Sequence, residues 1–146
     1  MRLGVKGRYA VTAMVDLSGQ PEGRLVTLSD IAHRQNLPLA YLEQLFVKLR
    51  RAGLVESTRG PQGGYRLAKE RQSIRIEEII CAVEEGLTFT ACSTRKGCLS
   101  PGAKCLTHDL WQGLDNHVRR YLHLHTLDDL SNGRVHASLQ SRDMHT

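Results

Sequence analysis

Residues 27–53 hold two short segments of helical periodicity, separated only by Asn36-Leu37-Pro38. The first segment begins at Thr27, whose hydroxyl suits a helix N-cap, with Asp30 at the third helical position. The second begins at Pro38, because proline suits the first position of a helix, and it stops at Gly53. The sequence therefore predicts two short helices joined by a tight turn. Their apolar faces are formed by Leu28, Ile31 and Ala32 in the first helix and by Leu42, Leu45, Phe46 and Leu49 in the second.

The segments on either side of this pair extend the pattern. Apolar residues at helical spacing occupy residues 8–18, and Gly19-Gln20-Pro21 ends them. Residues 54–67 indicate strand, loop and strand, with a turn-rich loop at residues 59–64. Helix, helix, turn, helix and hairpin is the order of a winged helix-turn-helix. We therefore expect residues 1–72 to form such a DNA-binding domain, with the Gly/Pro loop as its wing.

A long apolar stripe follows in the second half of the chain. Residues 73–85 have helical periodicity, and the chain then becomes small, polar and cysteine-rich up to Thr107. From Leu106 the stripe predicts an amphipathic helix of about four to five turns. A small winged-helix core cannot cover so long a stripe, so we expect the same helix of a second subunit to pack on it; packing on its own domain is the alternative. The stripe consists of Leu106, Leu110, Leu114, Val118 and Leu122, with Trp111 and Tyr121 beside it.

The length of 146 residues suits one such domain with a helical extension and excludes a large multidomain enzyme. We expect a mainly α-helical fold with a small β-hairpin. In this fold residues 73–130 supply a helix, a cysteine-rich loop and the dimerisation helix, and residues 131–146 form a polar, mobile tail. The longest nearly apolar run near the start, residues 10–15, is too short for a membrane span or a secretory segment. This predicts a cytoplasmic protein without a membrane partner.

The formal charge of +5 is concentrated in the first half of the chain. Residues 1–72 contain 12 Lys and Arg against 6 Asp and Glu, whereas residues 73–146 contain 8 against 9. The first half is therefore a candidate to bind a polyanion, and a merely solvated basic surface is the alternative.

In a helix-turn-helix, the N-terminal side chains of the second helix reach base edges in the major groove. Gln44 can pair with adenine, Glu43 can accept from the amino group of cytosine, and Tyr41 can reach a phosphate or a thymine methyl group. A solvated helix face is the alternative. The cations at the far end of this helix suit phosphates and are Lys48, Arg50 and Arg51.

The predicted wing supplies a candidate for minor-groove binding, Arg59. The glycines after it leave the backbone bare, which allows close approach to a narrow groove. The loop lacks the Gly-Lys-Ser/Thr ending of a nucleotide-binding loop and leads into a strand, which argues against a nucleotide site.

Three cysteines and one histidine follow the spacing C-x5-C-x6-C-x2-H, formed by Cys92, Cys98, Cys105 and His108. Reduced thiolates with an imidazole can hold a zinc ion or a two-iron cluster. The wide intervals favour an exposed iron–sulfur cluster over structural zinc, with an uncoordinated thiol-rich loop as a further alternative. Cys81 lies among apolar residues, where we expect a small core residue, and we expect Trp111 to serve packing.

Together these motifs resemble the IscR-type family of bacterial iron–sulfur cluster regulators. The resemblance covers residues 1 to about 130. It implies a homodimeric transcription regulator that binds a [2Fe–2S] cluster, receives it from the iron–sulfur cluster assembly machinery, and controls the genes of that machinery at double-stranded DNA operators. The ligands it implies are Cys92, Cys98, Cys105 and His108, and the DNA contacts are Tyr41, Glu43, Gln44 and Arg59. The segments that carry the resemblance are Met1-Arg2-Leu3, residues 6–14, residues 41–46, Arg59-Gly60-Pro61, Gly63-Gly64-Tyr65 and Cys105-Leu106-Thr107-His108.

Two positions depart from the family pattern. Residues 99–104 form an interval of six where the family has five, but a Pro-Gly turn can absorb one residue, so we expect coordination to survive with altered geometry. Ala40 stands where a hydroxyl is common in relatives. Two other classes share some of these features: a zinc-stabilised winged-helix protein without cluster sensing, and an electron carrier, which has no use for a wing. No arrangement of nucleophile, base and acid indicates an enzyme.

Overall fold

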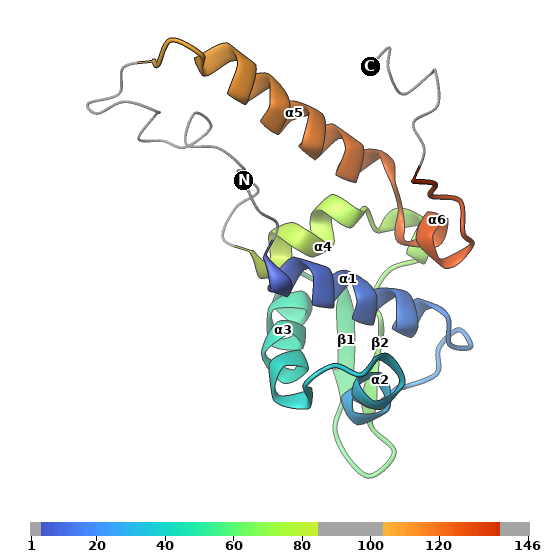
Figure 1. Cartoon of the computed structure of the whole chain (residues 1–146). Helices are drawn as coiled ribbons and strands as arrows, with labels where there is room; N and C mark the ends of the chain where they lie inside the picture. Colours follow the sequence, from blue (N-terminus) through green and yellow to red (C-terminus); the bar gives the residue numbers. More distant parts are fainter. Residues whose placement is uncertain (1–3, 85–103, 138–146) are drawn as a thin grey trace.

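The computed structural model of the chain describes residues 4–84 and 104–137 (Figure 1). The described part is mainly α-helical, with one antiparallel hairpin, and the predicted fold class is confirmed. Helices α1 to α3 and the hairpin form the body, α4 lies over α1, and α5 stands away from the body on the far side of α4. The elements are α1 (Val5–Ser18), α2 (Leu28–Gln35), α3 (Leu39–Arg51), β1 (Val55–Thr58), β2 (Gly64–Leu67), the 3₁₀ helix η1 (Arg71–Ser73), α4 (Ile76–Val83), α5 (His108–Leu124) and α6 (Leu127–Ser131).

The hydrophobic core confirms the apolar faces predicted for the helix-turn-helix. Within it, Phe46 of α3 meets Tyr65 of β2 edge-on, with ring centroids 5.0 Å apart. This contact attaches α3, the recognition helix, to the root of the wing. The largest fully buried side chains are Phe46, Met14, Ile31, Leu42, Leu49, Leu54, Ile74, Ile79, Ile80, Leu127, Val55 and Val83.

The first helix begins at Val5, three residues before the predicted start. Its N-terminus is stabilised from a distant part of the chain, because the Glu84 carboxylate accepts a hydrogen bond from the backbone N–H of Gly7 at 3.1 Å. A carboxylate at a helix N-terminus also interacts favourably with the helix dipole. The periodicity of residues 8–18 contains no sign of this long-range cap. For this reason the predicted start of the helix lies after the observed start at Val5.

The turn of the helix-turn-helix forms as its local sequence predicts. The Thr27 side chain caps α2 by accepting from the backbone N–H of Asp30 at 3.1 Å. Asn36 adopts a left-handed conformation with φ of 54°, a geometry that asparagine tolerates better than most residues. Pro38 is the N-cap of α3, so the helix begins at Leu39, one residue after the predicted start, and it ends at Arg51.

The wing is a hairpin in which Val55 pairs with Leu67 and Thr58 with Gly64. A backbone bridge between Val26 and Tyr65 joins β2 to the segment before α2. Gly64 makes this approach possible, because a Cβ atom there would lie 2.7 Å from the Val26 carbonyl oxygen, and its φ of 153° disfavours other residues. The glycine in the predicted turn-rich loop therefore holds the wing against the helix-turn-helix.

The segments at residues 74–76 and 125–127 lie side by side. The N–H of Leu127 donates to the Ile74 carbonyl at 2.8 Å, and an isolated antiparallel bridge forms between the two segments. This pairing holds the backbone extended before α4, so that α4 begins at Ile76 rather than at residue 73 as the periodicity predicts. It also fixes the C-terminal end of α5 to the body.

A short helix that the sequence analysis did not predict, α6, returns to the body after α5. Leu127 is fully buried in the common core. Arg71 links the surrounding elements, because its guanidinium donates to the Ser18 carbonyl at 3.2 Å and pairs with Asp128 at 2.9 Å. Core residues thus come from both sides of residue 72. The predicted division into residues 1–72, 73–130 and 131–146 therefore remains a proposal about which function each part of the chain serves.

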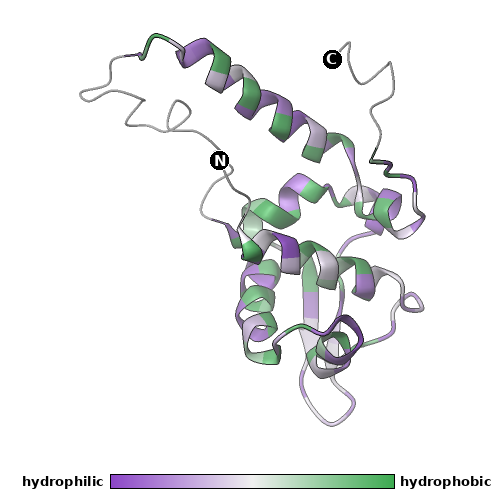
Figure 2. Cartoon of the chain, in the orientation of Figure 1, coloured by the Kyte–Doolittle hydropathy of each residue, from purple (hydrophilic) through white to green (hydrophobic). Residues whose placement is uncertain are grey.

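The predicted amphipathic helix is α5, and its 17 residues match the expected four to five turns. Figure 2 shows hydrophobic positions, in green, recurring along it. Leu122, near its C-terminus, packs against the core, whereas Leu110, Tyr121 and Leu124 are exposed. Within residues 4–84 and 104–137, no helix is long and apolar enough to cross a membrane.

Candidate nucleic-acid interface and metal centre

Polar side chains form the outer face of the recognition helix. Glu43 and Gln44 are exposed, and neither has a hydrogen-bond or ion-pair partner among the residues that the structure describes. Ala40 is exposed on the same helix. Tyr41 differs, because it is half-buried and its ring packs edge-on against Tyr9 of α1, with centroids 5.6 Å apart. Tyr41 therefore helps to hold α3 against α1, a contact that the sequence analysis missed.

The cations predicted to bind phosphate have different surroundings. The Lys48 ammonium donates to the Val83 carbonyl at 3.5 Å, and the Arg50 guanidinium donates to the Ser57 hydroxyl of β1 at 3.3 Å. Both hydrogen bonds are long, and a phosphate oxygen offers a stronger acceptor. Arg51 is exposed at the end of α3.

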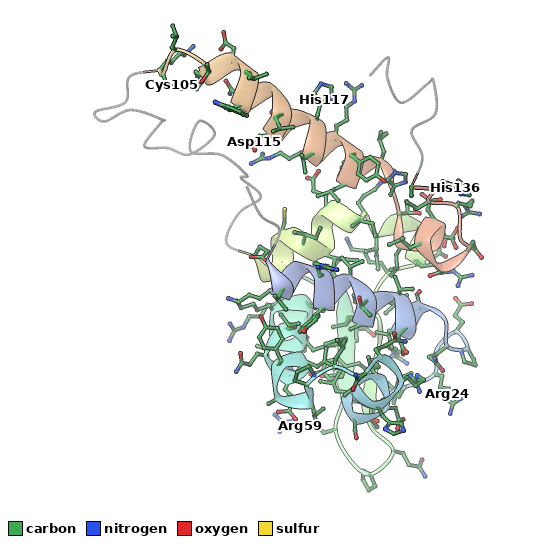
Figure 3. All side chains as sticks on the ribbon, in the orientation of Figure 1. Arg24, Arg59, Cys105, Asp115, His117 and His136 are labelled. Atoms are coloured by element: carbon green, nitrogen blue, oxygen red, sulfur yellow. The ribbon has the colours of Figure 1, made fainter. Side chains whose placement is uncertain are left out.

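Arg59 follows β1 directly and is exposed at the start of the wing loop (Figure 3). The backbone N–H of Gly63 donates to the Gly60 carbonyl at 2.9 Å and closes the loop. A Cβ atom at Gly63 would lie 2.1 Å from the Thr58 carbonyl oxygen, so glycine is required for this turn. The tight loop places a cation at the start of the wing, on a hairpin that the Phe46–Tyr65 contact attaches to the recognition helix.

Two of the four predicted metal ligands lie at the start of α5. The backbone N–H of His108 donates to the Cys105 carbonyl at 3.2 Å, which places the thiol and the imidazole on one turn. Cys92 and Cys98 fall in residues 85–103, outside the described residues. Among the residues that are described, no group of three or more His, Cys, Asp or Glu side chains converges on one point. A thiol and an imidazole on one turn are soft donors of the kind that zinc and iron take.

Three residues around these ligands were not predicted to belong to the site. The ring Nε2 of His108 lies 2.9 Å from the Gln112 Oε1. The indole N–H of Trp111 donates to the Thr107 hydroxyl at 2.9 Å, and that hydroxyl lies 4.0 Å from the Cys105 sulfur. The pairs His108–Gln112 and Thr107–Trp111 are each four residues apart, a spacing that brings side chains together on one face of a helix. That spacing is the sequence signal that could have identified them. Trp111 therefore makes a polar contact, and at 39% exposure it does not serve the packing expected of it within the described residues.

The candidate metal ligands and the wing lie at opposite ends of the molecule, as the labelled Cys105 and Arg59 show in Figure 3. The base of the cysteine-rich segment is nevertheless close to the recognition helix. Val83 accepts from Lys48 of α3, and Glu84 caps α1. Residues 83 and 84 thus contact two of the three helices of the predicted DNA-binding domain immediately before the cysteine-rich segment begins.

Cys81 contradicts the sequence prediction, because it is exposed and not a core residue. On α4 the apolar face is formed by its neighbours, and Cys81 points out of that face. Partial desolvation raises the pKa of its thiol, and the nearby carboxylate of Glu77 raises the pKa further, while Arg119 lowers it. A thiol with a raised pKa stays protonated at neutral pH and is a poor nucleophile.

An ion pair between the buried Asp16 and the partly exposed Arg34 connects α1 to the first helix of the helix-turn-helix. The Arg34 guanidinium donates to both carboxylate oxygens of Asp16, at 3.0 and 2.7 Å, and Gln35 donates to the same group at 2.8 Å. Burial alone would raise the pKa of Asp16, but these hydrogen bonds and the charge of Arg34 outweigh it and lower the pKa.

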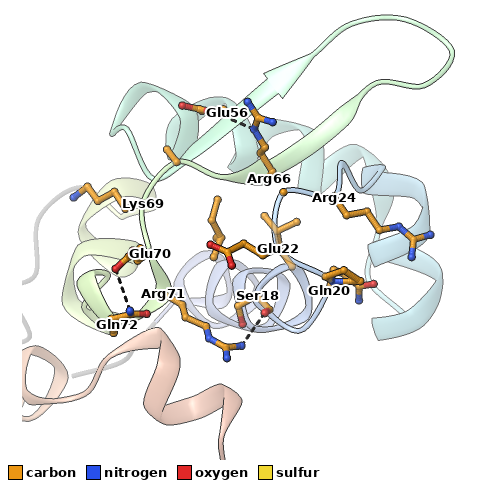
Figure 4. Close-up of a pocket in the computed structure, with 15 residues that line it drawn as sticks. Ser18, Gln20, Glu22, Arg24, Glu56, Arg66, Lys69, Glu70, Arg71 and Gln72 are labelled. Atoms are coloured by element: carbon orange, nitrogen blue, oxygen red, sulfur yellow. Dashed lines mark hydrogen bonds and ion pairs between the residues drawn. The ribbon is translucent and has the colours of Figure 1, made fainter.

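A cavity of about 720 Å³ lies between the α1–α2 loop, the hairpin and η1 (Figure 4). Several of its charged side chains are paired, such as Arg66 with Glu56 at 3.2 Å, and Arg71 with the Ser18 carbonyl. Among the described residues that line it, none belongs to the predicted DNA or metal sites.

These features define a class of protein. A winged helix-turn-helix with an exposed polar recognition helix, a cation on the wing and a basic N-terminal half is the architecture of a DNA-binding regulator. The chain belongs to the Rrf2 family, described as iron-dependent transcriptional regulators, whose family model matches residues 3–133.

Individual relatives agree with this assignment. The chain is 49% identical to the HTH-type transcriptional regulator IscR of Escherichia coli, over 92% of this chain and 82% of that protein. It is 53% identical to an HTH-type transcriptional regulator of Neisseria meningitidis, over 89% of this chain and 87% of the relative. These relatives are transcriptional regulators and not enzymes, and the resemblance to the IscR-type family is confirmed.

Solved structures show the same fold. The IscR of T. potens superimposes with a TM-score of 0.74 at 34% identity, covering 100% of this chain and 97% of that one. CymR, the global cysteine regulator of B. subtilis, superimposes with a TM-score of 0.77 at 33% identity, covering 90% of this chain and 97% of that one.

Proposed function

We propose that this transcriptional regulator is a homodimer that senses iron–sulfur cluster status through a [2Fe–2S] cluster and controls the genes of iron–sulfur cluster assembly. The cluster would come from the iron–sulfur cluster assembly machinery. The observation that carries the proposal is the combination, in one chain, of a winged helix-turn-helix with a thiol and an imidazole on the turn that leads into α5. We place the protein in the cytoplasm, where DNA is accessible and thiols stay reduced.

For DNA binding, we assign the base contacts to Tyr41, Glu43 and Gln44 and a minor-groove contact to Arg59. The exposure of Glu43, Gln44 and Arg59 supports this assignment. The phosphate contacts we assign to Lys48, Arg50 and Arg51, with Arg51 the most accessible because the other two donate hydrogen bonds within the chain.

For the cluster, we assign Cys92, Cys98, Cys105 and His108 as ligands. The donor chemistry of Cys105 and His108 fits this role, and the family description as iron-dependent supports iron over zinc. A bound cluster supplies a redox-sensitive group whose presence differs between cell states. The chain's own residues would carry this difference toward DNA, because residues 83 and 84 at the base of the cysteine-rich segment contact α3 and α1.

For the homodimer, the support is the exposed apolar surface of α5. Leu110 is 63% exposed, and Trp111, Tyr121 and Leu124 are each more than a third exposed. One helix that projects from the body and carries such side chains resembles one half of a two-helix interface.

The test compares the parent protein with a variant that cannot hold the cluster, Cys92→Ala/Cys98→Ala/Cys105→Ala. Both are purified without oxygen, and iron, sulfide and visible absorption are measured. We expect cluster absorption with two iron and two sulfide per chain in the parent only. A colourless parent that contains zinc would contradict cluster sensing and support the zinc alternative.

The second arm measures regulation. Both proteins are offered a random pool of DNA duplexes, and the bound sequences are determined. We expect the variant to keep its fold and dimer and to bind a narrower or different set of sequences. Identical preferences and affinities would mean that the cluster has no regulatory role through DNA binding, because a ligand shifts function only by its different affinity for two states.

A further inference from the structure

The starting observation is the side chain of Gln112, one helical turn after His108. The two residues lie on the same face of α5, and the His108 Nε2 is 2.9 Å from the Gln112 Oε1. His108 is only 9% exposed, so its ring is held in place by packing as well as by this hydrogen bond.

This contact favours one tautomer of the ring. Because the atom of Gln112 that faces the ring is the amide oxygen, which can only accept, the contact fits the tautomer in which Nε2 carries the proton and donates. A neutral imidazole protonated at Nε2 has its lone pair at Nδ1. Metal-bound histidines are oriented in this way, by an acceptor for the N–H that faces away from the metal.

The second observation concerns Thr107, the N-cap residue of α5. Its hydroxyl does not cap the helix backbone, although threonine commonly does so at this position. The hydroxyl instead accepts from the Trp111 indole at 2.9 Å and lies 4.0 Å from the Cys105 sulfur. A thiolate carries no proton, so toward a ligating Cys105 only the hydroxyl can donate.

We propose that Trp111 and Gln112 of α5 position both candidate ligands at the start of the helix: Gln112 presents His108 Nδ1 as the ligating nitrogen, and Trp111 holds the Thr107 hydroxyl so that it donates to the Cys105 sulfur. The inference rests on the proposed cluster and names the positioning residues of that same site. These residues would tune how firmly the cluster is held and at what potential it is reduced, because hydrogen bonds to ligands and sulfurs set both properties.

The direct test identifies the ligating nitrogen in the parent protein. The protein is produced with histidine labelled with ¹⁵N at either Nδ1 or Nε2, the cluster is reduced, and pulsed electron paramagnetic resonance measures the nitrogen couplings. The ligating nitrogen gives the strong coupling, and that coupling takes the ¹⁵N form only where the label is on the ligating atom. We therefore expect the ¹⁵N form with the Nδ1 label and the unlabelled form with the Nε2 label. A strong coupling from the Nε2 label would overturn the proposal.

Variants test the positioning roles. Gln112→Leu removes the acceptor and is expected to speed cluster loss to a chelator about 10-fold, whereas Gln112→Glu keeps an acceptor and is expected to retain parent behaviour. Asn116→Leu, the same kind of change one turn further along α5, is the control and should lose its cluster at the parent rate. Loss rates for Gln112→Leu equal to those of Asn116→Leu would contradict the role of Gln112.

The hydrogen bond to sulfur is tested through the reduction potential. Thr107→Val keeps the shape and removes the hydroxyl, so more negative charge stays on the sulfur and the midpoint potential is expected to become more negative. Trp111→Phe keeps a ring but frees the hydroxyl, and a smaller shift in the same direction is expected. Unchanged midpoint potentials in both variants would refute the proposed hydrogen bond from the Thr107 hydroxyl to the Cys105 sulfur.

The positioning by Gln112 can be tested separately from the presence of the cluster. If the parent holds no cluster, the tautomer of His108 is measured in the metal-free full chain by long-range ¹H–¹⁵N NMR near neutral pH. The Nε2–H tautomer in the parent and its loss in Gln112→Leu would support the positioning by Gln112, although the cluster assignment had failed. The Nδ1–H tautomer in the parent would overturn the positioning itself.

Discussion

Replacing Arg34 by methionine should destabilise the protein by breaking the ion pair with the buried carboxylate of Asp16. The Asp16 side chain is 3% exposed and accepts three hydrogen bonds, and the substitution removes the two that come from Arg34. Hydrogen bonds to a charged group contribute about 1.5–3 kcal/mol each, but the Arg34 side chain is 39% exposed and therefore partly screened. We expect the free energy of unfolding to fall by about 2 kcal/mol, which lowers Tm by about 6–10 °C in a chain of this size.

The pH dependence of this difference has a definite sign. The folded pKa of Asp16 lies below its unfolded value. Its contribution to stability is therefore fully present above the unfolded pKa, near pH 4, and is lost as the pH falls through the folded pKa. The gap in unfolding free energy between the parent and Arg34→Met should be constant near neutral pH and shrink below about pH 4.

Urea unfolding followed by circular dichroism, at several pH values, measures both effects. The matched control is Arg66→Met, which breaks the ion pair with Glu56 on the hairpin, where both side chains are about half exposed. That change should alter the free energy by at most about 0.5 kcal/mol. An Arg34→Met variant as stable as the control, or a gap that does not change down to pH 3, would refute the reasoning.

Three further predictions concern DNA binding and assembly. Arg59→Ala should lower operator affinity and reduce the slope of log affinity against log salt by about 0.9 per lost phosphate contact. Filter binding measures both quantities, and an unchanged affinity would mean that the wing does not contact DNA. Glu43→Ala should relax sequence choice more than it lowers affinity, which a binding selection measures; equal losses on all sequences would indicate a structural role. Leu114→Asp with Val118→Asp should give monomers in sedimentation, and an intact dimer would place the interface elsewhere.

The helix-turn-helix and the wing could be predicted because their determinants are local. The Thr27 hydroxyl and the Asp30 N–H that it caps are three residues apart, and Asn36 and Pro38 act on the turn in which they stand. The glycine-rich wing loop likewise depends on its own backbone conformation. Interactions that close within one turn are present in the sequence itself, so periodicity and capping rules suffice to find them.

The candidate metal site was predictable in part. The spacing of the cysteines and of His108 indicates soft ligands, and the start of α5 brings Cys105 and His108 onto one turn. Spacing gives residue types, however, and does not give the rotamers that decide which atoms meet. The contacts of Gln112 and Trp111 therefore became visible only with side chains in place.

The sequence by itself thus determined the order of helices α1 to α5 and the hairpin, the apolar faces of the helix-turn-helix and the chemistry of the candidate ligands. Only the tertiary structure decided that Cys81 is exposed, that Leu127 belongs to the core, and that Glu84 caps α1 from 77 residues away. An apolar pattern shows that a face must be covered but does not name the element that covers it. Contacts between distant residues depend on how the helices pack in three dimensions, and no short-range pattern records that arrangement.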